Sequence, residues 1–411
     1  MPSKQRVVVV GNGMVGHHFV QQLVSQQGDN KNVDITVLSG EDRLAYDRVQ
    51  LSSFFNGKTE DDLALTCSKT YQDWQVCFHT HSKVVDINRD AKKVTTAKGE
   101  SFEYDKLILA TGSFAFVPPI PGKDRDHCLV YRTINDLHAI KKSAQDSKVG
   151  VVIGGGLLGL EAAMGLSDRG MDVTVIHNND IPLNRQLDQE AGELLKQALE
   201  TRGLSFKMNA KTQSIVGHKH VEKVCFMDGS ELDADLVVMA IGIRPNMKLA
   251  QDCGLYCQKG IVVSDTLQTY DPNIYALGEC IEHRGDTFGL VAPLYEQAKV
   301  LANHLSEHGV AQFQSLPTAT KLKVTGIHLF SVGNFLGTQH SKNIIYRHPQ
   351  QGIYKKIVIE NNQIIGVVLY GDTQEGPFYQ ELLEEQINIQ QMRPYLMFGK
   401  ALCETQTEKA A

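Results

Sequence analysis

Apolar residues along this chain gather in short runs, and the first run opens a pattern that returns later. Four valines occupy residues 7–10, three glycines lie within residues 11–16, and apolar positions at helical spacing continue through residues 17–24. A second apolar run covers residues 34–38. Such an order is typical of parallel strands joined by a helix, so these residues predict a strand–turn–helix–strand unit.

The same order of patterns returns in the middle of the chain. An apolar run at residues 151–153 precedes the glycine-rich stretch 154–159, which is followed by a helical pattern to residue 170 and a second run at 172–176. Chance rarely places two complete copies of this unit in one chain. The repeat therefore predicts an α/β fold with two Rossmann-like dinucleotide-binding domains.

Further apolar runs divide the rest of the chain. Runs within residues 104–113, 233–242 and 269–280 predict more strands of the two domains, and runs at 321–324, 352–360 and 363–371 predict a small α+β C-terminal domain. We expect the first dinucleotide-binding domain at residues 1–115 and 241–312, the second at 116–240, the C-terminal domain at 313–400 and a tail at 401–411.

Composition and charge exclude several classes of protein. Of the 411 residues, 42% are hydrophobic and 21% charged, which is ordinary for a globular protein. The formal net charge of -6 argues against a nucleic-acid-binding surface, because phosphate binding needs a concentrated basic face. No apolar run reaches the roughly 18 residues that span a bilayer. We therefore expect a cytoplasmic protein that binds neither nucleic acid nor membrane.

Cysteines are scattered singly, apart from the pair Cys253 and Cys257. An intracellular chain keeps such thiols reduced. The pair leaves open a redox couple or half of a metal site, but no cluster of His and Cys lies near it in the sequence. We expect ordinary thiols and no metal.

The glycines of both turns suit the binding of a pyrophosphate. They let the backbone turn tightly and approach the phosphates, which then lie at the positive N-terminal end of the following helix. Glu41 follows the second strand of the first unit, where an acid can accept a hydrogen bond from a ribose hydroxyl. His177 holds the equivalent place in the second unit. The absence of an acid there removes a group that would disfavour the 2′-phosphate of NADPH, but no arginine lies beside it to bind that phosphate. The choice between NADH and NADPH stays open.

Two dinucleotide pockets in one chain indicate a specific chemistry. A protein that holds two dinucleotides at once can pass a hydride from a diffusing nicotinamide to a resident flavin. No proton abstraction is required for that transfer.

The residues after two predicted strands add a family resemblance. With Ala110-Thr-Gly112 after one strand and Gly278-Glu279 after another, the chain resembles the two-dinucleotide flavoproteins that include glutathione reductase, rubredoxin reductase and the ferredoxin reductases. The resemblance implies that the first unit binds FAD and the second NADH or NADPH. Family members commonly have Asp at position 279, and Glu can accept the same hydrogen bonds with one extra methylene.

The resemblance also implies roles for single residues. Glu161 stands where relatives use a Glu to hold the nicotinamide carboxamide, the alternative being a carboxylate on a helix surface. The residues expected to bind the two cofactors are Gly11, Gly13, Met14, Val15, Gly16, Glu41, Arg48, Ala110, Thr111, Gly112, Gly154, Gly156, Leu157, Leu158, Gly159, His177, Gly242, Gly278, Glu279 and Pro293.

Longer stretches narrow the resemblance. Residues 43–54, 130–137, 242–245 and 288–293 are similar to the FAD-containing N-terminal part of the large subunit of NAD(P)H-dependent nitrite reductase. The similarity runs from Gly11 to about Gly371. It implies a loop through Pro293 and then a helix whose N-terminus faces the flavin.

What the chain lacks bears on the electron acceptor. The redox cysteines of disulfide reductases have no counterpart in residues 46–53, so electrons leave the flavin for an external protein. Beyond Cys280 only Cys403 remains, too few thiolates for an iron–sulfur cluster. We expect the acceptor to be a separate sirohaem and iron–sulfur component of nitrite or nitrate reduction. The small polar residues of the tail, 404–411, favour a complete electron-transfer subunit over a fragment.

Two alternative functions and the oligomeric state stay open on the sequence alone. The acceptor can instead be rubredoxin or a ferredoxin. The chain can also be a redox sensor that binds FAD and NAD(P) without turnover. The sequence does not decide the oligomeric state, a homodimer included.

Overall fold

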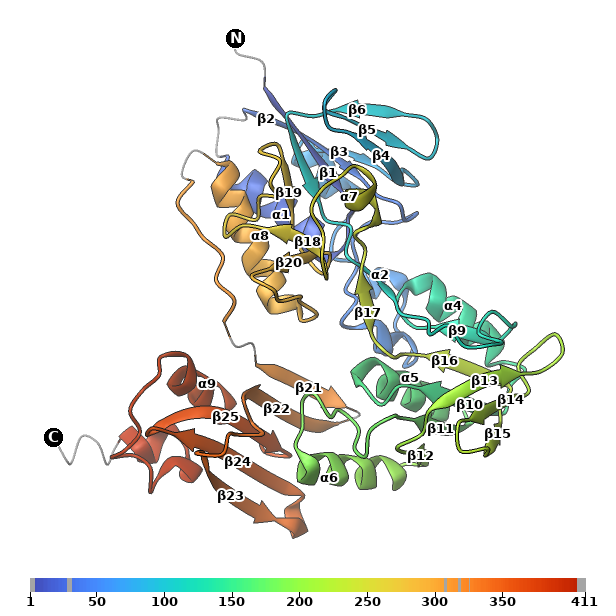
Figure 1. The fold of residues 1–411 in the computed structure, drawn as a ribbon, viewed down its shortest axis with the longest axis vertical. Coiled ribbons are helices and arrows are strands. Elements are labelled where there is room, and N and C mark those ends of the chain that lie inside the picture. The colour runs from blue at the N-terminus through green and yellow to red at the C-terminus, as the bar shows by residue number, and fades with distance from the viewer. Residues whose placement is uncertain (1–3, 28–31, 307–308, 317–318, 325, 405–411) are drawn as a thin grey trace. The chain divides into compact units, whose positions relative to one another are not determined.

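The computed structural model describes residues 4–27, 32–306, 309–316, 319–324 and 326–404. Residues 405–411 of the predicted tail lie outside the described residues. Contacts between residues divide the chain into two units, one of residues 1–115 and 243–315, the other of residues 116–242 and 316–411. Each unit is built around its own parallel sheet (Figure 1).

The sheet of the first unit has the strand order β19-β7-β1-β2-β3. The four valines of β1 are at most 5% exposed, as expected for a central parallel strand covered on both faces. Helices α1 and α8 pack against each other beside this sheet. The elements are β1 (Gln5–Val10), α1 (Met14–Gln26), β2 (Val33–Leu38), β3 (Cys77–His79), β7 (Lys106–Leu109), β19 (Ile274–Ala276) and α8 (Val291–Leu305).

Smaller elements complete the first unit. An antiparallel sheet consists of β4 (Val84–Asn88), β5 (Lys93–Thr96) and β6 (Ser101–Glu103). The pair β8 (Ser113–Ala115) with β17 (Ile243–Pro245) joins the two segments of the unit. The remaining elements are α2 (Glu60–Leu63), α3 (Ser68–Asp73), α7 (Lys248–Asp252), β18 (Ile261–Val263) and β20 (Ile281–His283). Phe313, the predicted first residue of the C-terminal domain, packs into the core of this unit.

The sheet of the second unit repeats the design, with the order β12-β11-β10-β16-β9. A three-stranded antiparallel sheet, β13-β14-β15, adjoins it. The elements are β9 (Cys128–Val130), α4 (Ile134–Ser143), β10 (Val149–Ile153), α5 (Leu157–Ser167), β11 (Asp172–Ile176), α6 (Gln189–Glu200), β12 (Leu204–Lys207), β13 (Thr212–Val216), β14 (Lys223–Phe226), β15 (Glu231–Asp233) and β16 (Leu236–Met239).

The C-terminal part of the second unit is an antiparallel sheet of order β21-β22-β25-β24-β23, with α9 packed on one face (Figure 1). The predicted fold class, two Rossmann-like domains with an α+β C-terminal domain, is confirmed. The elements are β21 (Thr320–Val324), β22 (Ile327–Gly333), β23 (Lys342–His348), β24 (Ile353–Glu360), β25 (Gln363–Tyr370) and α9 (Gly376–Glu384).

Candidate functional site

The first glycine turn joins β1 to α1 and leaves room at the helix N-terminus. Gly11 has φ +111°, and a Cβ there would lie 2.2 Å from the carbonyl oxygen of Ala110. A Cβ on Gly16 would lie 2.4 Å from the carbonyl oxygen of Gly11, so the helix and turn are in backbone contact. Gly13, the N-cap of α1, has open space instead, because a Cβ there would meet no atom within 4 Å.

The second turn, between β10 and α5, has the same geometry. Gly154 has φ +125°, and a Cβ there would lie 2.2 Å from the carbonyl oxygen of Ala240. A Cβ on Gly159 would lie 1.9 Å from the carbonyl oxygen of Gly154. Gly156, the N-cap of α5, again has no atom within 4 Å of a Cβ. Each unit therefore holds one open, positively polarised helix end, a place that suits a pyrophosphate.

A buried polar chain braces the first turn. The Tyr71 hydroxyl donates to the Asn12 side-chain oxygen at 2.8 Å and lies 2.9 Å from Nδ1 of His17. Since the hydroxyl proton goes to Asn12, Nδ1 of His17 carries a proton and donates to Tyr71. The ring of Trp74 stacks on His17 at 5.7 Å. No local signal in the sequence indicates this network, because Tyr71 comes from a helix far along the chain.

The protonation of His17 should make stability depend on pH. Burial, together with the neighbouring imidazole of His18, lowers the pKa of His17 to about 4. The unfolded chain binds the proton more tightly, so stability is full near pH 7 and falls as pH drops from about 6.5 towards 4. At pH 5 the loss is about 2 kcal/mol. Urea unfolding followed by the fluorescence of Trp74, the single tryptophan, measures it.

The variant His17→Gln should flatten this pH dependence between pH 7 and pH 5, and His18→Gln should retain most of it. An equal fall in the free energy of unfolding for His17→Gln and the wild-type protein would refute the assignment to His17.

Three predicted residues meet beside the first turn. The Glu41 carboxylate accepts hydrogen bonds from the Arg48 guanidinium and, at 3.1 Å, from the Tyr46 hydroxyl. The backbone N–H of Arg48 lies 3.4 Å from the sulfur of Met14. The structure thus brings Met14, Glu41 and Arg48 together, with Glu41 at the end of β2 where a ribose is expected to lie.

The strand ends of β7 and β19 bring further predicted residues together. Glu279 accepts a hydrogen bond from the Ser113 hydroxyl at 2.8 Å. The N–H of Gly278 donates to the fully buried side-chain oxygen of Gln297 at 2.8 Å. Thr111 donates to the carbonyl oxygen of Asn246 at 2.7 Å. Ser113, next to the predicted Ala110–Gly112, and Gln297, within a helical pattern, carried no signal that distinguished them from their neighbours.

The position of Pro293 corrects one prediction. The predicted loop extends through Pro293, but α8 begins at Val291, so Pro293 lies within the first helical turn. Proline is tolerated there because the first N–H groups of a helix have no intrahelical acceptor.

His177 lies against the second glycine turn. Its Nδ1 accepts a hydrogen bond from the N–H of Gly155 at 3.2 Å, which leaves the proton on Nε2, 3.1 Å from the Asn184 side-chain oxygen. The Leu183 N–H donates to the Gly155 carbonyl at 2.9 Å. Burial lowers the pKa of His177, which favours this neutral form. Both ring nitrogens are engaged within the protein.

The other predicted residues of the second unit lie at the same edge of the sheet. Leu157 and Leu158 form the first turn of α5, and Glu161 follows one turn later, half-buried. Tyr131 at the end of β9 is buried; burial and the charge of Glu161 raise its pKa. Gly242, after β16, has φ +112°.

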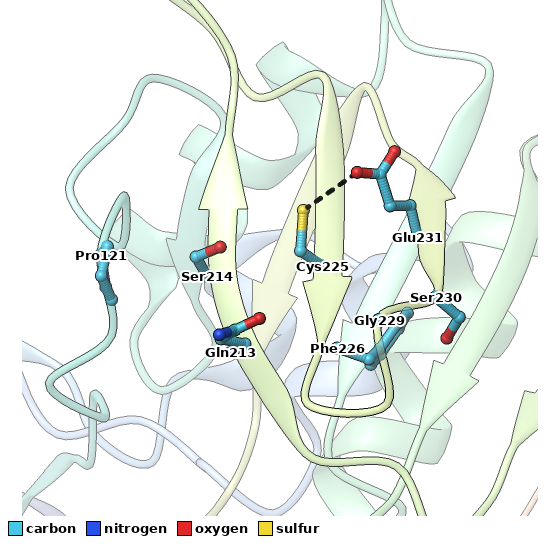
Figure 2. A pocket seen from close by; sticks show the side chains of 8 residues that line it. All are labelled: Pro121, Gln213, Ser214, Cys225, Phe226, Gly229, Ser230 and Glu231. Atoms are coloured by element: carbon cyan, nitrogen blue, oxygen red, sulfur yellow. Dashed lines mark hydrogen bonds between the residues drawn. The ribbon is translucent and has the colours of Figure 1, made fainter.

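A pocket of about 450 Å³ lies elsewhere, on the small sheet β13-β14-β15 (Figure 2). The Cys225 thiol points toward Glu231, with sulfur and carboxylate oxygen 3.9 Å apart. Lys223 donates to Glu231 at 2.8 Å and holds the pKa of this carboxyl below its usual value. The carboxylate is thus already paired, and no residue of a glycine turn lines the pocket.

The cysteine pair does not have the properties of a redox couple. All eight cysteines are free thiols. Burial raises the pKa of Cys253, and it raises the pKa of Cys257 to about 11, so neither thiol forms the reactive thiolate near neutral pH.

Within the described ranges, no three His, Cys, Asp or Glu side chains gather as a metal site. The described part of the chain also contains no helix long and apolar enough to cross a bilayer.

Two family models match successive parts of this chain. The family described as pyridine nucleotide-disulphide oxidoreductase matches residues 5–307, and the one described as rubredoxin NAD+ reductase C-terminal domain matches residues 318–387. Among solved structures, a ferredoxin reductase for the CYP199A2 system of Rhodopseudomonas palustris has a TM-score of 0.86 at 24% identity, with 94% of this chain and 96% of that one covered.

Curated relatives extend beyond this chain. A nitrite reductase [NAD(P)H] of Bacillus subtilis is 42% identical over 94% of this chain and 48% of its own length. An assimilatory nitrate reductase electron transfer subunit of the same organism is 40% identical over 91% of this chain and 48% of its own length. The chain therefore spans about half the length of these relatives.

Proposed function

The chain belongs to the pyridine nucleotide-disulphide oxidoreductase family, and from this membership we propose that it passes electrons from NADH or NADPH through FAD to an external redox protein. The observation that carries the proposal is the duplicated glycine turn, with open space at Gly13 in one unit and at Gly156 in the other. Two such sites suit a resident and a diffusing dinucleotide. As predicted from the sequence, we assign FAD to residues 1–115 and 241–312 and the nicotinamide cofactor to residues 116–240.

The residues of the first unit fit FAD. The N-terminus of α1 would hold the pyrophosphate, and Glu41, paired with the Arg48 guanidinium, would accept a hydrogen bond from a ribose hydroxyl. Glu279, oriented by Ser113, would accept hydrogen bonds from the ribityl chain. When bound, FAD supplies the ability to take a hydride from the nicotinamide and to release electrons singly.

The second unit would bind and orient the nicotinamide cofactor. The N-terminus of α5 would hold its pyrophosphate, and Glu161 would accept a hydrogen bond from the nicotinamide carboxamide. His177 carries no negative charge at the end of β11, so nothing on this side chain repels a 2′-phosphate, and we propose that both NADH and NADPH are used.

The acceptor we propose is the sirohaem and iron–sulfur component of nitrite or nitrate assimilation. The names of the two Bacillus relatives, each at least 40% identical to this chain, support it. Rubredoxin or a ferredoxin is the second candidate, which the match of residues 318–387 favours. Turnover with each purified acceptor separates the two.

Anaerobic mixing of the purified protein with NADH, and separately with NADPH, tests the electron-input step. Rapid loss of the visible flavin band with either donor is the expected result. Bound flavin that neither donor bleaches would reject the proposal and favour a sensor that binds cofactors without turnover.

Glu161→Ala should slow this bleaching. Loss of a hydrogen bond to a carboxylate is worth about 1.5–3 kcal/mol, so the rate constant should fall about 10- to 100-fold. Stopped-flow absorbance at saturating NADH measures the rate. Glu193→Ala, on the exposed side of α6, is the matched control and should bleach at the wild-type rate. Equal rates in both variants would exclude Glu161 from the nicotinamide site.

A further inference from the structure

The loop between β11 and α6, residues 177–188, runs along the carboxyl edge of the sheet where dinucleotides bind. His177 and Leu183 both form hydrogen bonds with Gly155 of the second glycine turn, and Asn184 forms one with His177. Residues 183–187 form one helical turn, in which the Leu187 N–H donates to the Leu183 carbonyl at 2.9 Å. This turn leads directly into Asp188, so the short segment 183–188 connects Asp188 to Leu183, which is hydrogen-bonded to Gly155 of the glycine turn.

Asp188 is held by the C-terminal sheet. One carboxylate oxygen caps α6 by accepting from the Ala191 N–H at 3.2 Å, and the other accepts from the Tyr354 hydroxyl at 2.7 Å and lies 3.1 Å from the ammonium of Lys356. Tyr354 is 2% exposed, and Asp188 and Lys356 are also buried. A buried, fully engaged carboxylate of this kind has little freedom to move.

Strand alternation shows that these contacts are directed at α6. Tyr354 and Lys356 lie on one face of β24, whereas Ile357 and Ile359 on the other face pack into the C-terminal domain's own core. Tyr354 pairs with Arg347 of β23 and with Tyr370 of β25, which puts the three in one row across the sheet.

Each neighbour of Tyr354 in this row also reaches α6. Arg347 donates twice to Glu190, at 2.5 and 2.7 Å. The Tyr370 hydroxyl donates to the Leu194 carbonyl at 3.3 Å. A row of three side chains therefore fixes the first turns of α6, and with them the end of loop 177–188.

We propose that Tyr354 and Lys356 are positioning residues for the nicotinamide nucleotide: through Asp188 they fix loop 177–188, so that the C-terminal domain sets the affinity of the second glycine turn for the ADP-ribose half of the cofactor. This inference rests on the proposed function, because it assumes that this turn binds NADH or NADPH. Affinity, not the rate of electron input, is the property that these residues control.

Calorimetric titration of the FAD-loaded protein with ADP-ribose tests the inference, since ADP-ribose binds without reducing the flavin. Tyr354→Phe removes only the hydroxyl and should raise the Kd about three- to tenfold, while the limiting rate of bleaching by saturating NADH stays at the wild-type value. Tyr379→Phe is the matched control. It removes another buried hydroxyl of the same domain, one that donates to the Leu396 carbonyl at 2.6 Å, and should leave the Kd unchanged.

Arg347→Gln gives an independent second variant, because Arg347 is exposed and its loss should not prevent folding. It should raise the Kd in the same direction as Tyr354→Phe. An unchanged Kd in both Tyr354→Phe and Arg347→Gln would overturn this inference but not the proposed function. A rise in Kd for Tyr379→Phe equal to that for Tyr354→Phe would do the same. Failure of the wild-type protein to bind ADP-ribose would overturn the proposed function as well.

Discussion

Gly156→Ala should leave the protein folded and loaded with FAD, yet weaken the binding of ADP-ribose and NADH by about 10- to 100-fold. The protein itself tolerates the methyl group, because a Cβ at this position meets no atom within 4 Å. The same methyl group would occupy the space in which a pyrophosphate approaches the N-cap of α5. Charge-assisted hydrogen bonds lost in this way are worth about 1.5–3 kcal/mol each. Calorimetry with ADP-ribose measures the change in Kd.

Two further glycine variants serve as controls for that experiment. Gly13→Ala should show the converse behaviour, with lower FAD occupancy and unchanged affinity for ADP-ribose, since its open space lies in the other unit. Gly159→Ala should fail to fold correctly, because its Cβ would lie 1.9 Å from the carbonyl oxygen of Gly154. If Gly156→Ala binds ADP-ribose as tightly as the wild-type protein, the pyrophosphate does not lie at this helix end.

Asp188→Ala should lower the free energy of unfolding of the second unit by roughly 3–5 kcal/mol. The substitution leaves the buried ammonium of Lys356 without its anion and also removes the cap of α6. Loss of a cap alone costs about 1 kcal/mol, so most of the expected effect comes from the uncompensated charge. Urea unfolding followed by circular dichroism measures the difference.

The N-cap of α4 provides a comparison for Asp188→Ala, because it is a neutral threonine and not a charged carboxylate. Thr133 caps α4 through the N–H of Asp136, and Thr133→Ala should cost about 1 kcal/mol. The double variant Asp188→Asn, Lys356→Met should recover much of the loss, because it removes both charges together. A similar cost for Asp188→Ala and Thr133→Ala would show that the pair with Lys356 contributes little to stability.

The parts of the fold that could be predicted are those with local signals. The glycine turns and their flanking strands were predictable because the chain must bend sharply at Gly11 and Gly154, where a side chain would meet a backbone carbonyl. The strands before Gly112 and Gly242 lie inside the predicted ranges 104–113 and 233–242 but cover only part of them, as β7 (Lys106–Leu109) and β16 (Leu236–Met239). Apolar residues beyond those strands pack in turns, which periodicity alone does not distinguish.

The polar networks that support the turns could not be predicted. Asn12 depends on Tyr71, and Asp188 depends on Tyr354, in each case through a contact between residues far apart in the chain. His177 was interpreted as a residue facing the ribose, because strand position alone indicates where a side chain starts. Its hydrogen bonds to Gly155 and Asn184 show that it also supports the turn, which the strand position could not indicate.

The two-sided burial of β24 and β25 limits how this protein can be re-engineered. Every residue of β24 from Tyr354 to Ile359 is buried, with one face toward its own domain's core and the other toward α6. A C-terminal domain taken from a relative would present foreign side chains to Asp188 and Glu190. A functional chimera must therefore exchange α6 and the C-terminal sheet together. A truncation at the end of α8 would expose to water the face of α6 that the C-terminal sheet covers.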